Sequence, residues 1–169
     1  ESVANHAEQP GKGVGRMIFR DINGDGVVDD NDRCIIGDPN PDCTIGLNLS
    51  ASWKNFTLST FFFSEIGVDI YNGTKKQLDL MSYGNLYTNR SKDVLNAWTA
   101  QNPNADIPAL SLNDNNNEAR MSTYYVEDGS YLKMKYLKLA YNFDQKLIKK
   151  LGLGSLSIYG QVENVFTIT

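Results

Sequence analysis

Residues 44–53 alternate strictly between apolar and small polar side chains, and this period of two constrains the fold more than any other feature. The apolar positions are Ile45, Leu47, Leu49, Ala51 and Trp53, and the others are Thr44, Gly46, Asn48, Ser50 and Ser52. Such alternation predicts a β-strand with one apolar and one polar face. Lys54 and Asn55 suit a tight turn, and residues 56–65 are rich in strand-forming Phe and Thr. The chain is therefore expected to be all-β, with an antiparallel hairpin here.

Strand character returns in the C-terminal part of the chain. Residues 130–143 place Leu132, Met134 and Tyr136 opposite Lys133, Lys135 and Leu137. Residues 155–166 form the last predicted strand, and residues 144–154 predict a short helical segment that stops at Gly152. Near the other end, residues 17–21 predict a further short strand.

The connections between these strands are very unequal in length. Residues 66–129 form one long connection, in which residues 70–84 and 91–101 have short helical periodicity. Residues 1–16 lack periodicity and are expected to be a flexible lead-in. Long strands joined by short turns at one end and a long loop at the other are typical of membrane β-barrels. Because the sequence starts without Met and stops inside a strand pattern, we expect it to be a piece of a longer protein.

Charge and motifs argue against several classes of function. The net charge is −4 and the 16 Lys and Arg form no basic run, so nucleic acid is not an expected partner. No apolar run is long enough for a membrane helix. The only histidine, His6, lies in the lead-in, and no phosphate-binding loop or nucleophile motif accompanies it. We therefore expect no enzymatic activity.

The stretch DINGDGVVDDND carries the most specific short motif. A loop with oxygen ligands at its first, third, fifth, seventh, ninth and twelfth positions can wrap one calcium ion, and a glycine at the sixth permits the sharp turn. The candidate ligands are Asp21, Asn23, Asp25, the carbonyl of Val27, Asp29 and Asp32, with Gly26 in the turn. The last ligand is Asp instead of Glu and the flanks look extended, as in calcium loops outside true EF-hands such as those of dockerins. The alternative is a solvated acidic turn.

Two cysteines flank the turn formed by residues 37–42. Their spacing suits a disulfide between Cys34 and Cys43 across the neck of a hairpin if the compartment is oxidising. In a reducing cell both would be inert thiols. Since no histidine or further cysteine lies nearby, a zinc site is not expected.

Five stretches, in this order, resemble one known family. They are RDINGDGVVDDNDRCIIGDPNPDCTIGLNLSASWKNFTLSTFFF, DIYNGTKK, DVLNAWTAQNPNADIPAL, YVEDGSYLKMKYLKLAYNF and IYGQVENVFTIT. Together they resemble the C-terminal barrel portion of SusC/RagA-type TonB-dependent outer-membrane transporters of Bacteroidota. The resemblance covers nearly everything after about residue 10.

The resemblance implies an antiparallel transmembrane β-barrel portion in contact with outer-membrane lipid. Residues 43–169 would belong to the barrel, with 66–129 as a long extracellular loop and short turns at the other rim. Residues 17–42 would hold an extracellular calcium loop and the turn after it. The implied function is import of oligosaccharides or peptides with a SusD-like surface lipoprotein, energised by TonB through an N-terminal part that this chain lacks.

A second kind of fold would produce the same alternation of apolar and polar residues. A secreted, calcium-stabilised β-sandwich that binds glycans or proteins would bury its apolar face against a second sheet and hydrate the other. A membrane strand would present the apolar face to lipid.

Overall fold

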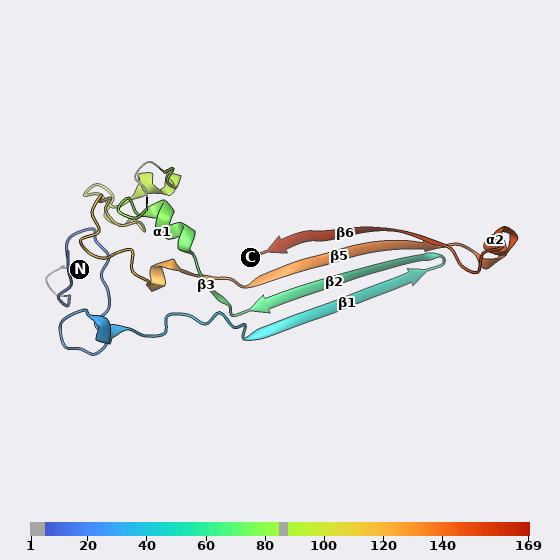
Figure 1. The fold of residues 1–169 in the computed structure, drawn as a ribbon, viewed down its shortest axis with the longest axis horizontal. Coiled ribbons are helices and arrows are strands. Elements are labelled where there is room, and N and C mark those ends of the chain that lie inside the picture. The colour runs from blue at the N-terminus through green and yellow to red at the C-terminus, as the bar shows by residue number, and fades with distance from the viewer. Residues whose placement is uncertain (1–5, 85–87) are drawn as a thin grey trace. The chain divides into compact units, whose positions relative to one another are not determined.

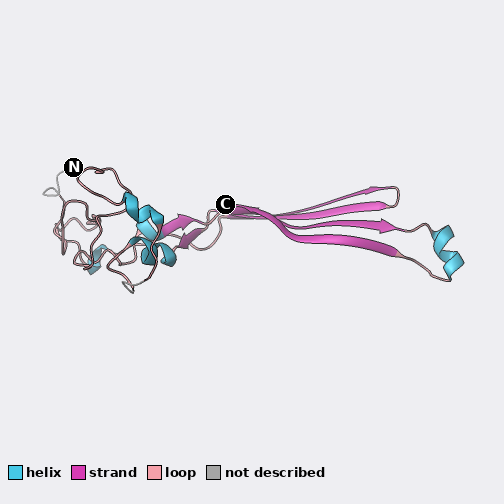
Figure 2. Cartoon of the chain, turned by 90° about the horizontal axis from the view of Figure 1, so that it is seen from above, coloured by secondary structure: helices cyan, strands magenta, loops and turns pink. Residues whose placement is uncertain are grey.

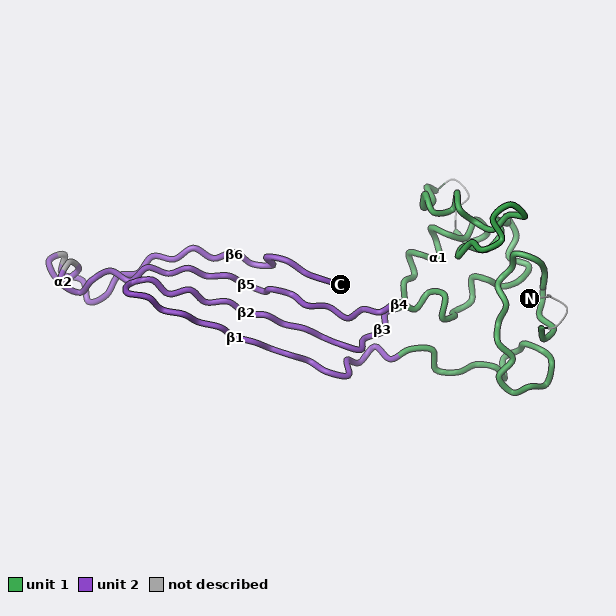
Figure 3. Tube along the Cα trace, turned by 180° about the vertical axis from the view of Figure 1, so that it is seen from behind, with its two compact units in different colours: residues 1–37, 71–127 green, residues 38–70, 128–169 purple. Residues whose placement is uncertain are grey.

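The chain divides into two compact units. The computed structural model describes residues 6–84 and 88–169. Unit 1 comprises residues 1–37 and 71–127, and unit 2 comprises residues 38–70 and 128–169 (Figure 3). Each unit is therefore built from two stretches of chain.

Unit 2 contains a four-stranded antiparallel sheet. Its strands are β1 (Cys43–Trp53), β2 (Phe56–Ile66), β5 (Tyr131–Asn142) and β6 (Ser157–Ile168), in the order β1-β2-β5-β6 (Figure 1). The predicted hairpin, the strand at 130–143 and the last strand are confirmed within two residues at each end. Within the described residues the sheet is open, with β1 and β6 as its edges, so the structure shows an antiparallel sheet and not a closed barrel.

The two faces of this sheet differ in chemistry. Cross-strand partners share a face, and Leu47 pairs with Phe62 while Leu58 pairs with Leu139. The register therefore gathers one apolar face, made of Ile45, Leu47, Leu49, Ala51, Trp53, Phe56, Leu58, Phe62, Leu132, Met134, Leu137, Leu139, Tyr141, Ile158, Val162, Phe166 and Ile168. These side chains are unusually open to solvent: Leu49 is 49% exposed and Ile158 is 63% exposed. In the part of the chain that the structure describes, no second sheet buries this face.

A β-bulge changes the alternation in β5. The pairing of β2 with β5 shifts between Phe61 and Phe62, and that of β5 with β6 shifts between Met134 and Tyr136. The prediction that Tyr136 shares the face of Leu132 and Met134 is therefore wrong. The extra residue, Lys135, moves Tyr136 to the polar face and returns Leu137 to the apolar one, because a bulge reverses the facing of the residues that follow it.

One end of the sheet carries two short connections. Lys54 and Asn55 form the predicted tight turn between β1 and β2, with Lys54 at φ 53°. Between β5 and β6 lie α2 (Gln145–Ile148) and η5 (Lys149–Leu151), which end at Gly152 in the left-handed conformation, as expected for a helix stop (Figure 2).

Unit 1 consists mainly of turns and short helices. Its elements are η2 (Asp30–Asp32), α1 (Gly73–Asp79), η3 (Lys92–Asn96) and η4 (Thr123–Tyr125). A two-stranded sheet of β3 (Asp69–Tyr71) and β4 (Val126–Asp128) has residues in both units. The helical periodicity predicted within residues 70–84 and 91–101 is thus confirmed as α1 and η3. Asn72 caps α1 by accepting a hydrogen bond from the amide of Lys75 at 2.9 Å.

The strand predicted at residues 17–21 is not formed. The backbone of this segment pairs with side chains instead of with a neighbouring strand: the amide of Met17 donates to Glu118, and that of Phe19 donates to Gln9. The Met17 carbonyl accepts from Gln9 and Asn116. These bonds satisfy the backbone groups that a β-ladder would have used.

A buried polar cluster explains these contacts and holds the segment before residue 17. It consists of Gln9, Arg16, Asn116 and Glu118. Asn116 is fully buried and Glu118 is 2% exposed, and the Arg16 guanidinium forms an ion pair with Glu118 at 2.8 Å. Of the predicted flexible lead-in, residues 6–16 are therefore anchored by specific contacts, while residues 1–5 lie outside the described part.

The expected disulfide is absent from the structure. Cys34 and Cys43 are both free and exposed. The prediction assumed a hairpin neck, but residues 33–39 form no strand, and Cys43 begins β1 opposite Ile66. The segment carrying Cys34 is therefore not the partner of β1.

As for helices, none in the described chain is both long and apolar enough to cross a membrane.

Candidate functional site

The first half of the acidic loop folds around Asp21. Its carboxylate accepts hydrogen bonds from the amides of Gly24 at 2.6 Å and Gly26 at 2.8 Å. Gly26 has φ 88°, a left-handed conformation that glycine adopts without strain. Asn23 and Asp25 bond to each other, and the amide of Val27 donates to Asp25 at 2.9 Å. The pattern of the sequence thus produces a tight, locally bonded turn.

The second half of the loop closes on Asp32. Asp29 caps η2 and accepts from the amide of Asn31, while Asp32 accepts from the amides of Asp29 and Ile22 at 2.8 and 2.7 Å. The amides of Asp29, Ile22 and Asn23, and then the side chain of Asp21, hold the pKa of Asp32 below its ordinary value. The first and twelfth positions of the motif therefore meet.

Hydrogen bonds divide the six predicted ligands into smaller groups. Asp21 and Asp32 come together, Asn23 pairs with Asp25, and Asp29 faces Asn31. Val27 contributes its amide to Asp25, and the neighbouring Gly26 carbonyl accepts from Glu8. Among the described side chains, no three His, Cys, Asp or Glu residues lie close enough to hold a metal ion. What the structure contains is an ordered acidic turn with two adjacent carboxylates.

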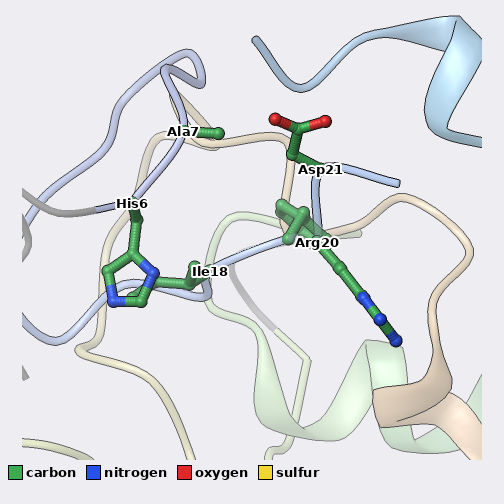
Figure 4. Close-up of a pocket in the computed structure, with 6 residues that line it drawn as sticks. His6, Ala7, Ile18, Arg20 and Asp21 are labelled. Atoms are coloured by element: carbon green, nitrogen blue, oxygen red, sulfur yellow. The ribbon is translucent and has the colours of Figure 1, made fainter. Parts of the chain in front are cut away.

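A shallow pocket lies beside the start of this loop. It has a volume of about 340 Å³ and is lined by His6, Ala7, Ile18, Phe19, Arg20 and Asp21. Figure 4 shows that the charged ends of Arg20 and Asp21 point away from each other. A ligand site needs convergent polar groups, so this pocket offers little for recognition.

The polar face of the sheet carries hydroxyl side chains that lie close together across β1 and β2, and the alternation of residues 44–53 had placed two of them, Ser50 and Ser52, on this face. Ser50 and Ser59 lie 3.3 Å apart, and Ser52 lies 3.2 Å from Thr57. Towards the other end of β2 the same face carries aromatic rings, since Phe61 and Phe63 follow on that side. Tyr136 of β5 also lies on this face. The sequence signal that could have placed Tyr136 there is the break in the alternation of residues 130–143 at Lys135 and Tyr136.

Known proteins match this chain over most of its length. TonB-dependent receptor P3 of Formosa agariphila is 36% identical over 92% of the chain and 15% of the receptor. TonB-dependent receptor SusC of Bacteroides thetaiotaomicron is 28% identical over 96% of the chain and 15% of that protein. No protein-family model matches. The chain thus spans about one seventh of the length of these relatives.

One solved structure has a fold similar to that of this chain. The structure of the RagAB peptide transporter matches 80% of this chain and 14% of the solved chain, with 29% identity and a TM-score of 0.68. The relatives are receptors and transporters, which confirms the expectation that the chain is not an enzyme. TonB-dependent receptors reside in the outer membrane, and that location follows for this chain. The chain belongs to the SusC/RagA-type TonB-dependent receptors, of which it is one segment.

Proposed function

We propose that this segment forms part of the transmembrane barrel wall and the extracellular loops of an importer of oligosaccharides or peptides. The observation that carries the proposal is the pair of unlike faces of the sheet, one apolar and exposed and the other polar. Strands of 11 and 12 residues are long enough for a tilted membrane crossing, which takes about 9–11 residues. In this assignment the apolar face meets lipid and the polar face lines the lumen.

Aromatic side chains at one end of the apolar face support this placement. Phe56 and Tyr141 lie 4.9 Å apart between ring centroids, and Trp53 pairs with Phe56 at the tight turn. Aromatic rings are enriched where membrane strands pass through the lipid headgroups. A secreted sandwich is the second candidate, but it would need another sheet over an apolar face on which Trp53 is 69% exposed.

The partners proposed for the whole receptor are a SusD-like surface lipoprotein and TonB. The names of the relatives support a transport role, and the length of those relatives leaves room for a TonB-contacting part outside this chain. In this arrangement residues 66–129 lie on the extracellular side and the tight turn lies at the other rim. The cargo is an oligosaccharide or a peptide.

Fractionation of cells that make the full-length receptor tests this proposal. We expect the receptor in the outer-membrane fraction, soluble only in detergent, and bound to a lipoprotein when it is purified. The same purification from cells that lack the lipoprotein is the control. Recovery of the intact receptor as a soluble monomer without detergent would contradict the proposal.

We also propose that the acidic loop binds calcium to hold its shape, with no catalytic role. Two adjacent carboxylates repel each other when both are ionised, and a cation reverses the sign of that interaction. Asp32 accepts hydrogen bonds from the amides of Ile22 and Asn23, directly after Asp21, so the two ends of the loop lie close together. This closure and the oxygen-rich donor set support the assignment. Asn23, Asp25, Asp29 and the Val27 carbonyl would complete the ligand set.

Replacing Asp25 with alanine is expected to abolish calcium binding while the sheet stays folded, because the strands that the structure describes pair with one another and not with this loop. Calorimetric titration of the chelated full-length receptor should show wild-type binding in roughly the 0.1–1 mM range of extracellular sites. Asp30→Ala is the matched control, since Asp30 lies in the same loop outside the six ligand positions. If wild type and Asp25→Ala give the same absence of heat, the loop is only a solvated turn.

A further inference from the structure

The polar face of unit 2 has two chemically distinct halves. Near the tight turn it presents small hydroxyl side chains, as described above. Towards the far end of β2 it presents four aromatic rings: Phe61 lies 6.4 Å from Phe63 and 6.2 Å from Tyr136, and Phe63 lies 6.2 Å from Tyr131. Phe61 also lies over Gly46, where an added Cβ would come within 3.5 Å of its ring. The rings thus form a continuous surface across β2 and β5.

The bulge in β5 adds a cation to this surface. Lys135 is the residue inserted between Met134 and Tyr136, and its Nζ lies 4.0 Å from the centroid of Phe63 and 5.8 Å from that of Phe61. A lysine at this distance is attracted by the negative face of the ring. Bulges commonly redirect one side chain, and here the bulge brings Lys135 onto the rings.

The lysines of this face have no acidic partner. Over residues 6–84 and 88–169, no carboxylate lies within ion-pair distance of Lys133, Lys135 or Lys138. The acidic residues of the same face are Glu65 and Glu163, and Glu163 accepts a hydrogen bond from Gln161 at 2.9 Å. The face therefore keeps an excess of positive charge although the chain as a whole has a net charge of −4.

We propose that this aromatic–lysine patch, made of Phe61, Phe63, Tyr131, Lys133, Lys135 and Tyr136, binds carboxylate-bearing cargo. A lysine ammonium has three donors and no acceptor, so it recognises an anion, and the rings offer flat apolar surface to the groups that carry the carboxylate. An acidic peptide and an oligosaccharide that contains uronic acid share this chemistry. The inference rests on the proposed import function and narrows its cargo.

Calorimetric binding to the full-length receptor in detergent tests the patch. The acidic probes are tetraglutamate and tetragalacturonate, and the neutral probes are tetraglutamine and maltotetraose. We expect an acidic probe to bind more tightly than its neutral counterpart, with an affinity that falls as salt is added. Lys135→Gln should weaken acidic binding about tenfold, the scale of one lost charged hydrogen bond, and leave neutral binding unchanged.

Two matched variants separate the patch from general effects. Lys54 lies 4.6 Å from the Trp53 ring, so Lys54→Gln removes a similar cation–ring contact at the tight turn and should not change binding. Phe63→Leu should weaken binding, whereas Phe62→Leu on the opposite face should not. Comparing the affinities of tetraglutamate and tetragalacturonate shows whether the patch prefers a peptide carboxylate or a sugar carboxylate.

Three results would each overturn the proposal that the patch binds carboxylates. They are equal affinity for acidic and neutral probes, no binding of either acidic probe, and equal effects of Lys135→Gln and Lys54→Gln. The import proposal fails separately. If the receptor binds acidic probes with loss in Lys135→Gln but cells that make it do not take those probes up, the patch is supported and the import function is contradicted.

Discussion

Replacing Leu49 with arginine in the full-length receptor is expected to prevent most of it from assembling in the outer membrane. Leu49 lies in the middle of β1 on the apolar face, opposite Thr60. An arginine on the lipid side near the bilayer midplane costs about 2–4 kcal/mol in membrane β-barrels. That is a large share of the stability of an ordinary domain, which is about 5–15 kcal/mol.

The neighbouring residue supplies the control. Ser50 lies on the polar face opposite Ser59, so Ser50→Arg places the same charge on the side assigned to the lumen. The measurement is the amount of folded receptor in the outer-membrane fraction, together with its urea midpoint after refolding into lipid vesicles. Equal folding of Leu49→Arg and Ser50→Arg would mean that the apolar face does not meet lipid.

Replacing Arg16 with alanine is expected to release the first stretch of unit 1. Arg16 is the ionic partner of Glu118, whose side chain is 2% exposed, and removing one member of a buried pair costs about 3–5 kcal/mol because the other charge stays buried. Hydrogen exchange and limited proteolysis of the full-length receptor should show faster exchange and new cleavage in residues 9–17 and 114–118.

Two further variants identify the cause of this effect. Arg33→Ala removes the ion pair with Asp30, in which both side chains are at least 80% exposed, and should change protection little. Adding Glu118→Gln to Arg16→Ala removes the buried carboxylate that has lost its ionic partner. It should restore part of the protection against hydrogen exchange and proteolysis. Unchanged protection in Arg16→Ala would show that the remaining hydrogen bonds of Gln9 and Asn116 hold the segment alone.

The sequence was most informative where one face of a strand is uniform. The alternation in residues 44–53 predicts both the extent of β1 and which of its side chains share a face, because successive side chains of a strand point to opposite faces. In residues 130–143 the same rule gave the strand but misplaced Tyr136, since a bulge reverses the phase and is visible only as a break in the pattern.

Other features depended on partners distant in the sequence. Met17 and Phe19 look like strand residues, yet their backbone groups bond to Gln9 and Glu118, which local patterns do not reveal. The disulfide prediction assumed that spacing implies a hairpin, and the pairing of Cys43 with Ile66 removed that assumption. In the acidic loop the spacing predicted the turn around Gly26 and the approach of Asp21 to Asp32, while calcium binding stays a prediction.

The division of unit 1 into two stretches bears on the order in which the chain folds. The bond from Gln9 to Asn116 joins residues 107 positions apart, and closing so long a loop costs entropy that grows with its length. The hairpin of β1 and β2 lies inside that loop, and the pairing of these two strands with each other is local, so it can form in about 1–10 μs. Once formed, it shortens the span that remains to be closed. Residues 9–17 precede the hairpin in the chain, yet they are therefore expected to be among the last of this segment to reach their native contacts.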